Sequence, residues 1–479
     1  MTHERVRFLS AALPAWAACA VLLSSCAEEA QQGPPRGVIT TEETLLTPEF
    51  WIGRLEGAET IVMERAAIDA QNAKLLELDP SMHDLRAIPT TLRGERVAEL
   101  LHDLADKPDP GLYDESGNLL PVPTLDALAG NLDLAAIPAE QVTRYGLVVH
   151  RADLRTFPSR LRAFRSPTNS DIDRFQESAL FPGTPVVIAH ESGDGDWWFV
   201  ISPRYAAWIE KQHVAEGTAA EVFGYVDKTP YRIVTGATVR TVFNPELHAL
   251  SELQLDMGVR VPLLAGRDAD LPVNGQHPYS AHVIELPVRS EEGALRLEPA
   301  LLQKNAETAN DYLPLTRANI VRQGFRFLGE RYGWGHSYNG RDCSGFVSEV
   351  YRSMGAMMPR NTSAQSVSPA LDQQRFGREV GSDQRLQAIR SLNAGDLVYI
   401  PGHVMMVIGF IEGEPWVIHD TTGISYHADE GEMVRVQLNA VSVTPLMPLQ
   451  FNETESYVDR MTSIVKIVPD PAKEAPPSL

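Results

Sequence analysis

The sequence predicts a multidomain α+β protein with a helical N-terminal domain, two small β-barrels and a C-terminal α+β domain. Three observations indicate this. The chain has 479 residues, enough for about three domains. Apolar residues make up 43% of it, which suffices for substantial buried cores. The hydrophobic pattern changes from helical spacing to short alternating runs, and then returns to helical spacing.

The first 25 residues have the features of an export signal. Basic residues precede an apolar run that starts at Phe8, is too short to span a membrane and contains Pro14. The motif LSSC, which ends at Cys26, resembles a bacterial lipobox, whose cysteine is lipidated and becomes the first mature residue. We therefore expect a lipoprotein-type signal peptide over 1–25 and a polar tether over 26–45. An ordinary cleaved signal is the alternative.

The net charge and the cysteine content limit the classes of function that we expect for this protein. The formal net charge is −21 and no basic stripe occurs, so we do not expect nucleic-acid binding. Of three cysteines, Cys19 leaves with the signal and Cys26 takes lipid, so Cys343 remains as the single free thiol. No internal disulfide and no multi-cysteine metal site is then expected, and no HExxH motif or other cofactor signature occurs. A lone thiol in an exported protein risks oxidation, which favours a catalytic role.

The first 312 residues contain the helical and the β patterns in turn. Helical spacing over 46–140 predicts a helical domain, with Thr47 as N-cap and Pro48 at the first helical position. Residues 141–220 alternate short strand-like runs with turn clusters, which indicates a small β-barrel. Residues 221–312 repeat this pattern: ADLRTFPS is echoed by ATVRTVFNP, and GTPVVIAH by GVRVPLLA. A second barrel is predicted there; chance similarity between β-sequences is the alternative.

Residues 313–450 predict an α+β domain. A helix capped by Thr316 comes first, and a second helix starts at Cys343 and ends near Gly355. Three strand-like runs follow, DLVYI, HVMMVIGF and PWVIHD. Residues 451–479 are expected to form a C-terminal tail, frayed beyond about residue 465. The second helix carries an apolar stripe at helical spacing, formed by Phe346, Val347, Val350, Tyr351 and Met354.

Cys343 lies where a helix can activate a thiol. The unpaired N–H groups and the positive dipole end of a helix favour a thiolate and can stabilise an oxyanion. A nucleophile also needs a base, and His403 opens one strand-like run while His419 closes the next. We predict a triad in which His403 accepts the thiol proton and His419 orients His403. Structural roles for all three residues are the alternative.

The pairing register of the hairpin decides whether the two histidines meet. A tight turn at EGE would place His403 opposite Gly423. The histidines face each other if pairing is centred near Ile411, with a longer loop from about residue 409 to 415. We expect this second register.

Several motifs together resemble a known family. RDCSGFV preceded by YGWG, GDLVYI leading into HVMMVIG, and VIHDTTG resemble the NlpC-type cysteine peptidases of bacterial cell walls, over residues 316 to about 450. The order of domains resembles a subgroup with an N-terminal clip domain, two bacterial SH3-like barrels and the catalytic domain last. The resemblance implies a papain-like fold for the last domain. It also implies an endopeptidase of peptidoglycan stem peptides or muropeptides that cuts between γ-D-Glu and the diamino acid when L-Ala has a free amino group.

The resemblance also implies roles for single residues. Asp342 and Ser344 match positions that bind the ammonium group of that L-Ala, and a carboxylate beside a hydroxyl suits a cation. Tyr205 resembles an aromatic residue that closes the site from the first barrel, and Tyr332 resembles a tyrosine near the oxyanion site. Thr362 takes a position where the family often has serine. Packing is the alternative for both tyrosines.

Two further expectations concern access to the site and the place of the enzyme. His336 stands where the family commonly has glycine, and it either lines the cleft or alters the fit of the substrate. The first barrel would wall off one end of the groove, which favours released muropeptides over intact wall. The protein would be exported and lipid-anchored at the periplasmic face or the cell surface. A wall-binding lipoprotein with an inactive peptidase domain, and an amidase or acyl transferase on the same scaffold, are the alternatives.

Overall fold

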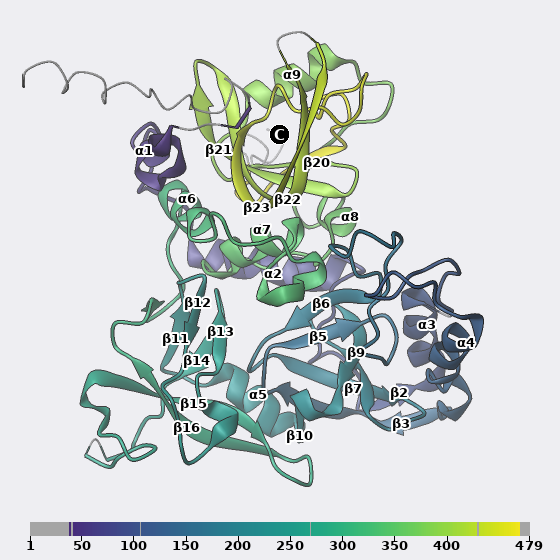
Figure 1. Ribbon diagram of the computed structural model, residues 1–479. Helices are drawn as coiled ribbons and strands as arrows, with labels where there is room; N and C mark the ends of the chain where they lie inside the picture. The colour runs from purple at the N-terminus through teal and green to yellow at the C-terminus, as the bar shows by residue number, and fades with distance from the viewer. Residues whose placement is uncertain (1–37, 40–41, 106, 269, 429–430, 470–479) are drawn as a thin grey trace, which may run out of the picture.

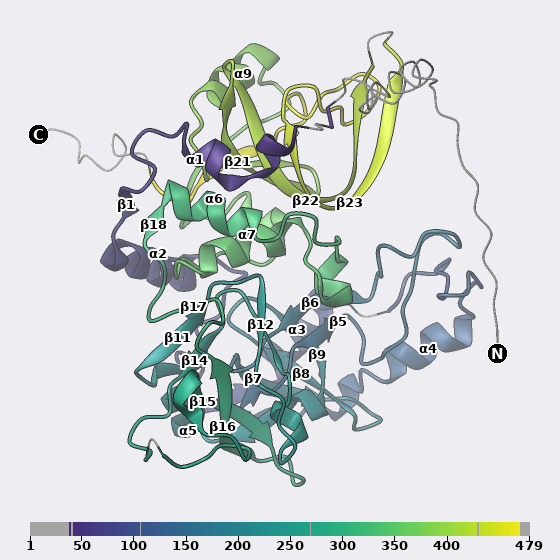
Figure 2. The same cartoon turned by 60° about the vertical axis from the view of Figure 1, so that its left-hand side comes forward.

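The computed structural model describes residues 38–39, 42–105, 107–268, 270–428 and 431–469. The predicted signal peptide, Cys26 and the end of the predicted tail lie outside the described residues. Figures 1 and 2 show the C-terminal sheet at one end of the molecule, the two β domains at the other, and helices α2, α6 and α7 between them. Within the described ranges, no helix has the length and apolarity needed to cross a membrane.

The N-terminal region is divided between two cores and does not pack as a separate helical domain. Trp51 and Leu75 belong to the core that holds the cysteine helix. Leu101 and Leu125 belong instead to the core of the first barrel. Helices α1 and α2 thus pack against the C-terminal domain, and α3 and α4 pack against the first barrel. The elements are α1 (Pro48–Ile52), β1 (Ile61–Met63), α2 (Arg65–Leu78), β2 (Thr91–Arg93), α3 (Gly94–Leu104), α4 (Val122–Gly130) and β3 (Glu140–Val142).

The first barrel is built on a seven-stranded antiparallel sheet in the order β10-β4-β7-β8-β9-β5-β6. Its central strand β8 is buried along its whole length, because Trp198 and Val200 belong to one core and Trp197 and Phe199 belong to another, which α3 and α4 share. A helix with a capping box formed by Thr218 and Glu221 leads out of it. The elements are β4 (Arg144–Val148), β5 (Ala152–Arg155), β6 (Gln176–Leu180), β7 (Pro185–Glu191), β8 (Trp197–Ile201), β9 (Ala206–Glu210), β10 (Val214–Gly217) and α5 (Ala219–Asp227).

The second β domain consists of small antiparallel sheets around one core that includes Val234, Leu255 and Ile284. The echoed segments ADLRTFPS and ATVRTVFNP contain β5 and β12, and the second echoed pair contains β7 and β14, so the repeats fall on strands in the same order. The strands are β11 (Tyr231–Val234), β12 (Thr238–Arg240), β13 (Gln254–Asp256), β14 (Arg260–Pro262), β15 (Ala281–Arg289), β16 (Leu295–Gln303) and β17 (Thr308–Ala309).

The C-terminal domain has a six-stranded sheet in the order β19-β24-β20-β21-β22-β23. Helices α6 and α7 share a core with one of its faces, and α9 shares a core with the other. This is the predicted α+β arrangement. The elements are β18 (Leu315–Thr316), α6 (Arg317–Phe325), α7 (Cys343–Arg352), α8 (Thr362–Gln365), β19 (Asp372–Arg375), α9 (Ser382–Arg390), β20 (Leu397–Ile400), β21 (His403–Ile411), β22 (Glu414–His427), β23 (Met433–Pro445) and β24 (Ser463–Lys466).

The predicted tail, 451–479, contributes to this sheet. Strand β24 pairs with β19 on one side and with β20 on the other. Val465 at its centre is fully buried. The chain therefore remains part of the folded domain through Lys466, because the SIVK segment completes the ladder between two strands that precede it in sequence.

The hairpin that carries the histidines differs from the predicted one. Strands β21 and β22 pair up to Ile411 and Glu414, so the turn is tight. Glu412 and Gly413 between them have φ angles of 52° and 84°, as a type I′ turn requires. The predicted long loop is therefore wrong. A register shift between Val407 and residue 409 then changes which residues of β21 and β22 face each other along the rest of the hairpin.

The register shift brings the histidines together. Beyond it, Met406 pairs with Ile418, and the same register places His403 opposite Thr421. His419 lies two residues from Thr421 on the same face, so the imidazoles are diagonal neighbours. At the shift, Gly409 packs against Trp51, and a Cβ atom there would lie 3.0 Å from the indole. The N-terminal region thus packs directly on the irregularity that sets the histidine register.

Candidate active site

Cys343 is the first residue of α7, as predicted. Asp342 is the N-cap, and its Oδ1 accepts a hydrogen bond from the backbone N–H of Gly345 at 2.8 Å. The predicted apolar stripe of the helix is buried. The Cys343 side chain is itself buried, with the whole residue 6% exposed. The backbone N–H of Val404 is among the groups that act on the pKa of this thiol, so the sulfur lies near the beginning of β21.

The two predicted histidines are hydrogen-bonded to each other next to this cysteine. His403 immediately precedes Val404, and its Nε2 is 2.8 Å from Nδ1 of His419. His419 is fully buried, and its Nε2 is 3.1 Å from Oγ1 of Thr444. The chain of hydrogen bonds is satisfied when His403 donates from Nε2 to His419, and His419 donates from Nε2 to Thr444. His403 Nδ1 then has the free lone pair of a base.

The resting protonation state differs from the predicted one. Burial raises the pKa of the Cys343 thiol to about 12, and the Asp342 carboxylate adds to this effect, while the Val404 N–H opposes it. Burial lowers the pKa of His403 to about 4. The predicted resting thiolate is therefore wrong, because desolvation and a neighbouring negative charge outweigh the helix N-terminus. A neutral thiol and a neutral imidazole are present instead.

A groove of about 770 Å³ opens at His403. Tyr332, Trp334 and His403 line it from the C-terminal domain, and Asn169 and Asp171 line it from the first barrel. Burial, and then the charge of a Cys343 thiolate, would raise the pKa of the Tyr332 phenol. Tyr332 thus lies on the same groove as His403.

The predicted ammonium-binding pair already has a cationic partner. Both carboxylate oxygens of Asp342 accept hydrogen bonds from Arg360, at 3.1 and 2.8 Å, and Ser344 Oγ accepts one at 2.9 Å. Burial alone would raise the pKa of Asp342, but Arg360 and His336 lower it to about 2. The carboxylate is thus ionised and paired within the protein. The prediction that Asp342 and Ser344 offer a free site for an ammonium group is wrong.

Tyr205 holds a different carboxylate. Its hydroxyl donates a hydrogen bond to Glu177, which follows the first residue of β6. Glu177 also accepts a hydrogen bond from Thr156. Burial, and then Glu177, raise the pKa of Tyr205, whereas Asn361 and Arg360 of the C-terminal domain lower it. The tyrosine therefore lies at the boundary between the two domains. No sequence motif pointed to Glu177; only its pairing with Tyr205 reveals it.

His336 belongs to a buried polar network. Its Nδ1 accepts a hydrogen bond from Arg360 at 3.0 Å, and its Nε2 lies 3.1 Å from Glu349. Burial lowers the pKa of His336 to about 4, so the ring is neutral. A Cβ atom at Gly345 would lie 2.6 Å from this ring, so glycine permits the close contact. His336 does not line the groove of Tyr332 and His403.

Two further residues complete the description. Thr362 begins α8, and no described contact joins its side chain to the cysteine, the histidines or Asp342. Asp420 follows His419 and is fully buried, and neither of its carboxylate oxygens has a partner among the described residues. Burial, then Glu330 and Asp342, raise its pKa well above the usual value. Its charge would act on both Cys343 and Tyr332, so this carboxyl group lies beside the site.

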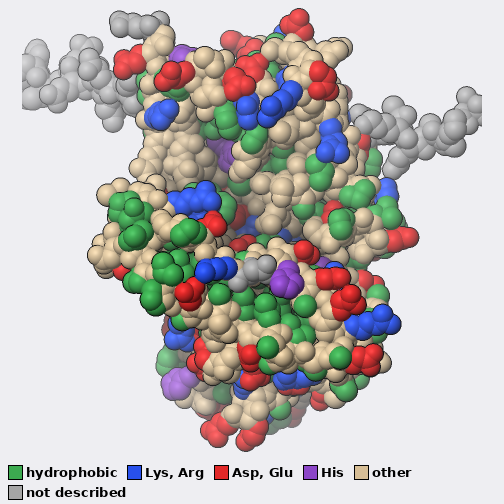
Figure 3. All heavy atoms as spheres, turned by 90° about the vertical axis from the view of Figure 1, so that its right-hand side faces the viewer, with side chains coloured by type: hydrophobic (Ala, Val, Ile, Leu, Met, Phe, Trp, Pro, Cys, Tyr) green, Lys and Arg blue, Asp and Glu red, His purple; other side chains and the backbone are tan. Residues whose placement is uncertain are grey.

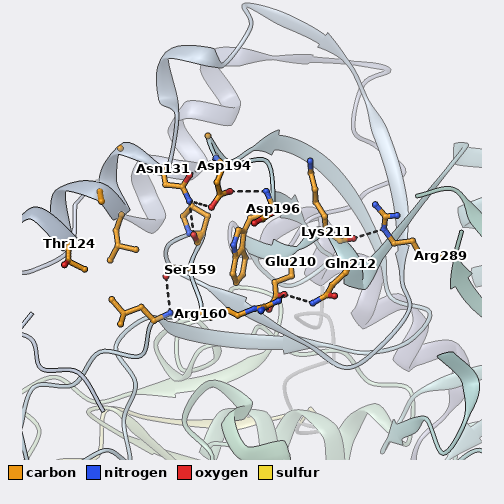
Figure 4. A pocket seen from close by; sticks show the side chains of 17 residues that line it. Thr124, Asn131, Ser159, Arg160, Asp194, Asp196, Glu210, Lys211, Gln212 and Arg289 are labelled. Atoms are coloured by element: carbon orange, nitrogen blue, oxygen red, sulfur yellow. Dashed lines mark hydrogen bonds and ion pairs between the residues drawn. The ribbon is translucent and has the colours of Figure 1, made fainter. Parts of the chain in front are cut away.

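A larger cavity of about 1190 Å³ lies elsewhere, between α4 and the first barrel (Figure 4). Many of the polar groups around it are already paired, including Asn131 with Asp194 and Arg160 with Glu210. None of the predicted site residues lines it. On the face shown in Figure 3, acidic and basic side chains are intermingled, as expected for a protein without a basic stripe.

Comparison with known proteins identifies related domains. Residues 329–443 match the NlpC/P60 family, and residues 162–210 match an SH3 domain of the SH3b1 type. The chain is 30% identical over 213 residues to a gamma-D-glutamyl-L-lysine dipeptidyl-peptidase from Bacillus cereus. That match covers 41% of this chain and 56% of the relative, so the chain spans little more than half of that curated protein.

The solved structures support the fold. An NlpC/P60 endopeptidase from Photobacterium damselae subsp. piscicida aligns over 86% of this chain and 95% of its own, with a TM-score of 0.68 and 16% identity. The resemblance drawn from the motifs is confirmed, and so is the predicted fold class with SH3-like and papain-like domains.

Proposed function

The C-terminal domain of this chain is an NlpC/P60 domain, and on that premise we propose that the protein is a cysteine endopeptidase of peptidoglycan stem peptides. The observation that supports this most is the 2.8 Å hydrogen bond between His403 and His419 beside the single free cysteine of the described chain. A structural cysteine would not need an imidazole pair at its side. An inactive domain would not be expected to keep the nucleophile, the base and the orienting group together.

In the proposed reaction, the Cys343 sulfur attacks the scissile carbonyl carbon while His403 Nδ1 accepts the thiol proton. Because the resting pair is neutral, this transfer occurs as the nucleophile attacks. The backbone N–H groups at the start of α7 face the oxyanion, with Tyr332 nearby. His403 then delivers the proton to the leaving amine. Water attacks the thioester, and its hydrolysis returns the free thiol.

The bond proposed for cleavage joins γ-D-Glu to the diamino acid in peptides with a free L-Ala amino group. The name of the Bacillus cereus relative supports this choice. Within this chain, Glu177 is the carboxylate proposed to bind the ammonium group, because Tyr205 holds it at the domain boundary while Asp342 is neutralised by Arg360. Binding the free terminus would position the peptide bond at the thiol.

The first barrel supports a preference for released muropeptides over intact wall. Its residues Asn169 and Asp171 line the groove, and Trp334 of the C-terminal domain donates a hydrogen bond to Gln176 of β6 at 3.0 Å. The barrel therefore borders the groove of Tyr332 and His403, where a long glycan-linked substrate would meet it. We further propose, from the lipobox-like motif, that Cys26 anchors the protein by lipid at the periplasmic face or the cell surface.

Mass spectrometry of stem peptides tests the proposal. The peptide L-Ala-γ-D-Glu-diamino acid should yield the dipeptide L-Ala-γ-D-Glu, and Cys343→Ala should abolish cleavage without unfolding the protein. Acetylation of the L-Ala amino group should lower the rate at least tenfold. Full activity of Cys343→Ala would refute the nucleophile. Release of whole stems from the glycan would instead identify an amidase, and no turnover of any of these substrates would favour the inactive wall-binding protein.

A further inference from the structure

A third cavity lies at the junction of the first barrel, the second β domain and the catalytic domain. Its volume is about 320 Å³, in the lower range of sites for small molecules. Most of its wall is apolar. Leu180 and Phe181 come from the first barrel, and Met357 and Met358 come from the chain that follows α7. The groove of Tyr332 and His403 has a separate set of lining residues.

Three arginines interrupt this apolar wall: Arg204, Arg352 and Arg360. The charge of Arg360 is balanced by Asp342, which lies 2.8 Å away. Arg352 donates its hydrogen bonds to the carbonyl oxygen of Met257 and places its guanidinium 4.5 Å from the centre of the Phe181 ring. Neither contact supplies a negative charge. Two of the three guanidinium groups therefore lack a directly bonded anion among the described residues.

Arg204 is the most exceptional of the three. The residue is partly exposed, but its Nε and Nη2 atoms are buried and have no hydrogen-bond partner in the described chain. Burial, and then the charges of Arg352 and Arg360, lower the pKa of Arg204 to about 9. Buried charges are ordinarily paired, because an unpaired one loses its hydration without compensation. These two unsatisfied donors adjoin a cavity that three arginines line, and a bound anion would compensate their buried charge.

We propose that this cavity binds a small carboxylate with an apolar body. The guanidinium of Arg204 presents donors in a planar fork that matches a carboxylate. Leu180, Phe181, Met357 and Met358 offer an apolar surface for an aliphatic chain attached to it. Such a ligand satisfies the buried donors and the apolar wall together, which a bare inorganic anion does not. The site goes beyond the proposed peptidase activity and does not depend on it.

Calorimetry and thermal unfolding of the full chain test this site with defined probes. Sodium hexanoate should bind and raise the melting temperature in a concentration-dependent manner, at least tenfold more tightly than acetate. Hexylammonium, which has the same chain and the opposite charge, should give no shift. A shift with inorganic phosphate but not with hexanoate would overturn the proposal, because the apolar wall would then have no role. The absence of any shift with hexanoate would overturn it too.

Variants locate the binding. Arg204→Gln should weaken hexanoate binding at least tenfold, and it should raise the melting temperature of the ligand-free protein because it removes an uncompensated buried charge. Arg352→Gln provides a second test of the same cavity. Arg296→Gln is the matched control, since Arg296 is an exposed residue of β16 paired with Glu298. Hexanoate binding that is equal in wild-type protein, Arg204→Gln and Arg352→Gln would refute the assignment. Hexanoate that bound only adventitiously, away from this cavity, would bind all the variants with the same affinity.

Discussion

Arg360 binds both carboxylate oxygens of Asp342, the residue that caps the cysteine helix. The guanidinium therefore occupies the position that the motif implied for a substrate ammonium group. The same arginine contacts Ser344 and His336, so it links the predicted recognition residues into one internal network. We therefore propose that Glu177 recognises a free amino terminus and that Asp342 has a structural role. This assignment leads to separate predictions for the two carboxylates.

Asp342→Asn should destabilise the protein, by about 3 kcal/mol in the free energy of unfolding, because it leaves the buried Arg360 without its counter-charge. Urea denaturation at pH 7 measures the loss. Asp383→Asn, at an exposed position in the first turn of α9, is the control and should be neutral. Because the pKa of Asp342 is lowered to about 2 in the folded state, its contribution is present at neutral pH and is lost as the pH falls from about 4 towards 2.

Glu177→Gln should lower kcat/KM on peptides with a free L-Ala about 10- to 100-fold, as expected for the loss of a hydrogen-bonded charge pair. On peptides with acetylated L-Ala, the same substitution should lower kcat/KM much less, because these peptides lack the ammonium group. Kinetics on the matched pair of substrates measures the difference. Glu298→Gln on β16 serves as the control. An equal loss on both substrates would contradict ammonium recognition by Glu177.

Thr444→Val should lower kcat about tenfold with little change in KM, in the range expected for a positioning group. Without the Thr444 hydroxyl, His419 loses the partner of its Nε2 and can carry its proton on Nδ1, towards His403. His403 would then no longer present a free lone pair to the thiol. Ser442→Ala is the control, because its hydroxyl on the same strand bonds the carbonyl of Ala440. Equal effects of both changes would argue against this role.

The pH profile of kcat/KM should have an acid limb well below the usual pKa of histidine, near 4, because burial lowers the pKa of His403 to about that value. Below this limb, His403 is protonated and cannot accept the thiol proton, so the rate falls as the pH falls. The limb should be determined by stopped assays between pH 3 and pH 8, after the stability of the fold has been verified at each pH. A limb near 6.5 would show an ordinary, hydrated imidazole.

Asp420→Asn should stabilise the protein more at pH 7 than at pH 4. The pKa of Asp420 is raised by burial, so its carboxyl group keeps its proton to higher pH in the folded protein than in the unfolded chain, where it ionises above about 4. Rising pH therefore favours unfolding of the wild-type protein at this residue, and asparagine removes that effect. Melting temperatures of both proteins across this pH range measure it. A difference that shrinks as the pH rises would indicate an ionised, paired carboxylate.

Much of the catalytic domain follows from local patterns. The N-cap and apolar stripe of the Cys343 helix are set by neighbours in sequence, and the helix forms as predicted. The hairpin turn was harder to predict, because the left-handed conformation at Glu412 and the register shift near Gly409 have little sequence signature. The contact of Gly409 with Trp51 joins segments that are far apart in the chain. No local pattern indicates such a contact.

By itself, the sequence determined the order of the domains, the helix that begins at the cysteine and the three residue types of the proposed triad. These depend on spacing and side-chain chemistry over a few positions, which the chain carries without its fold. The tertiary structure alone decided the protonation state of the thiol, the pairing of Asp342 with Arg360 and the burial of two Arg204 donors without a partner among the described residues. Those properties depend on which distant groups exclude water or bring charge, and only packing brings such groups together.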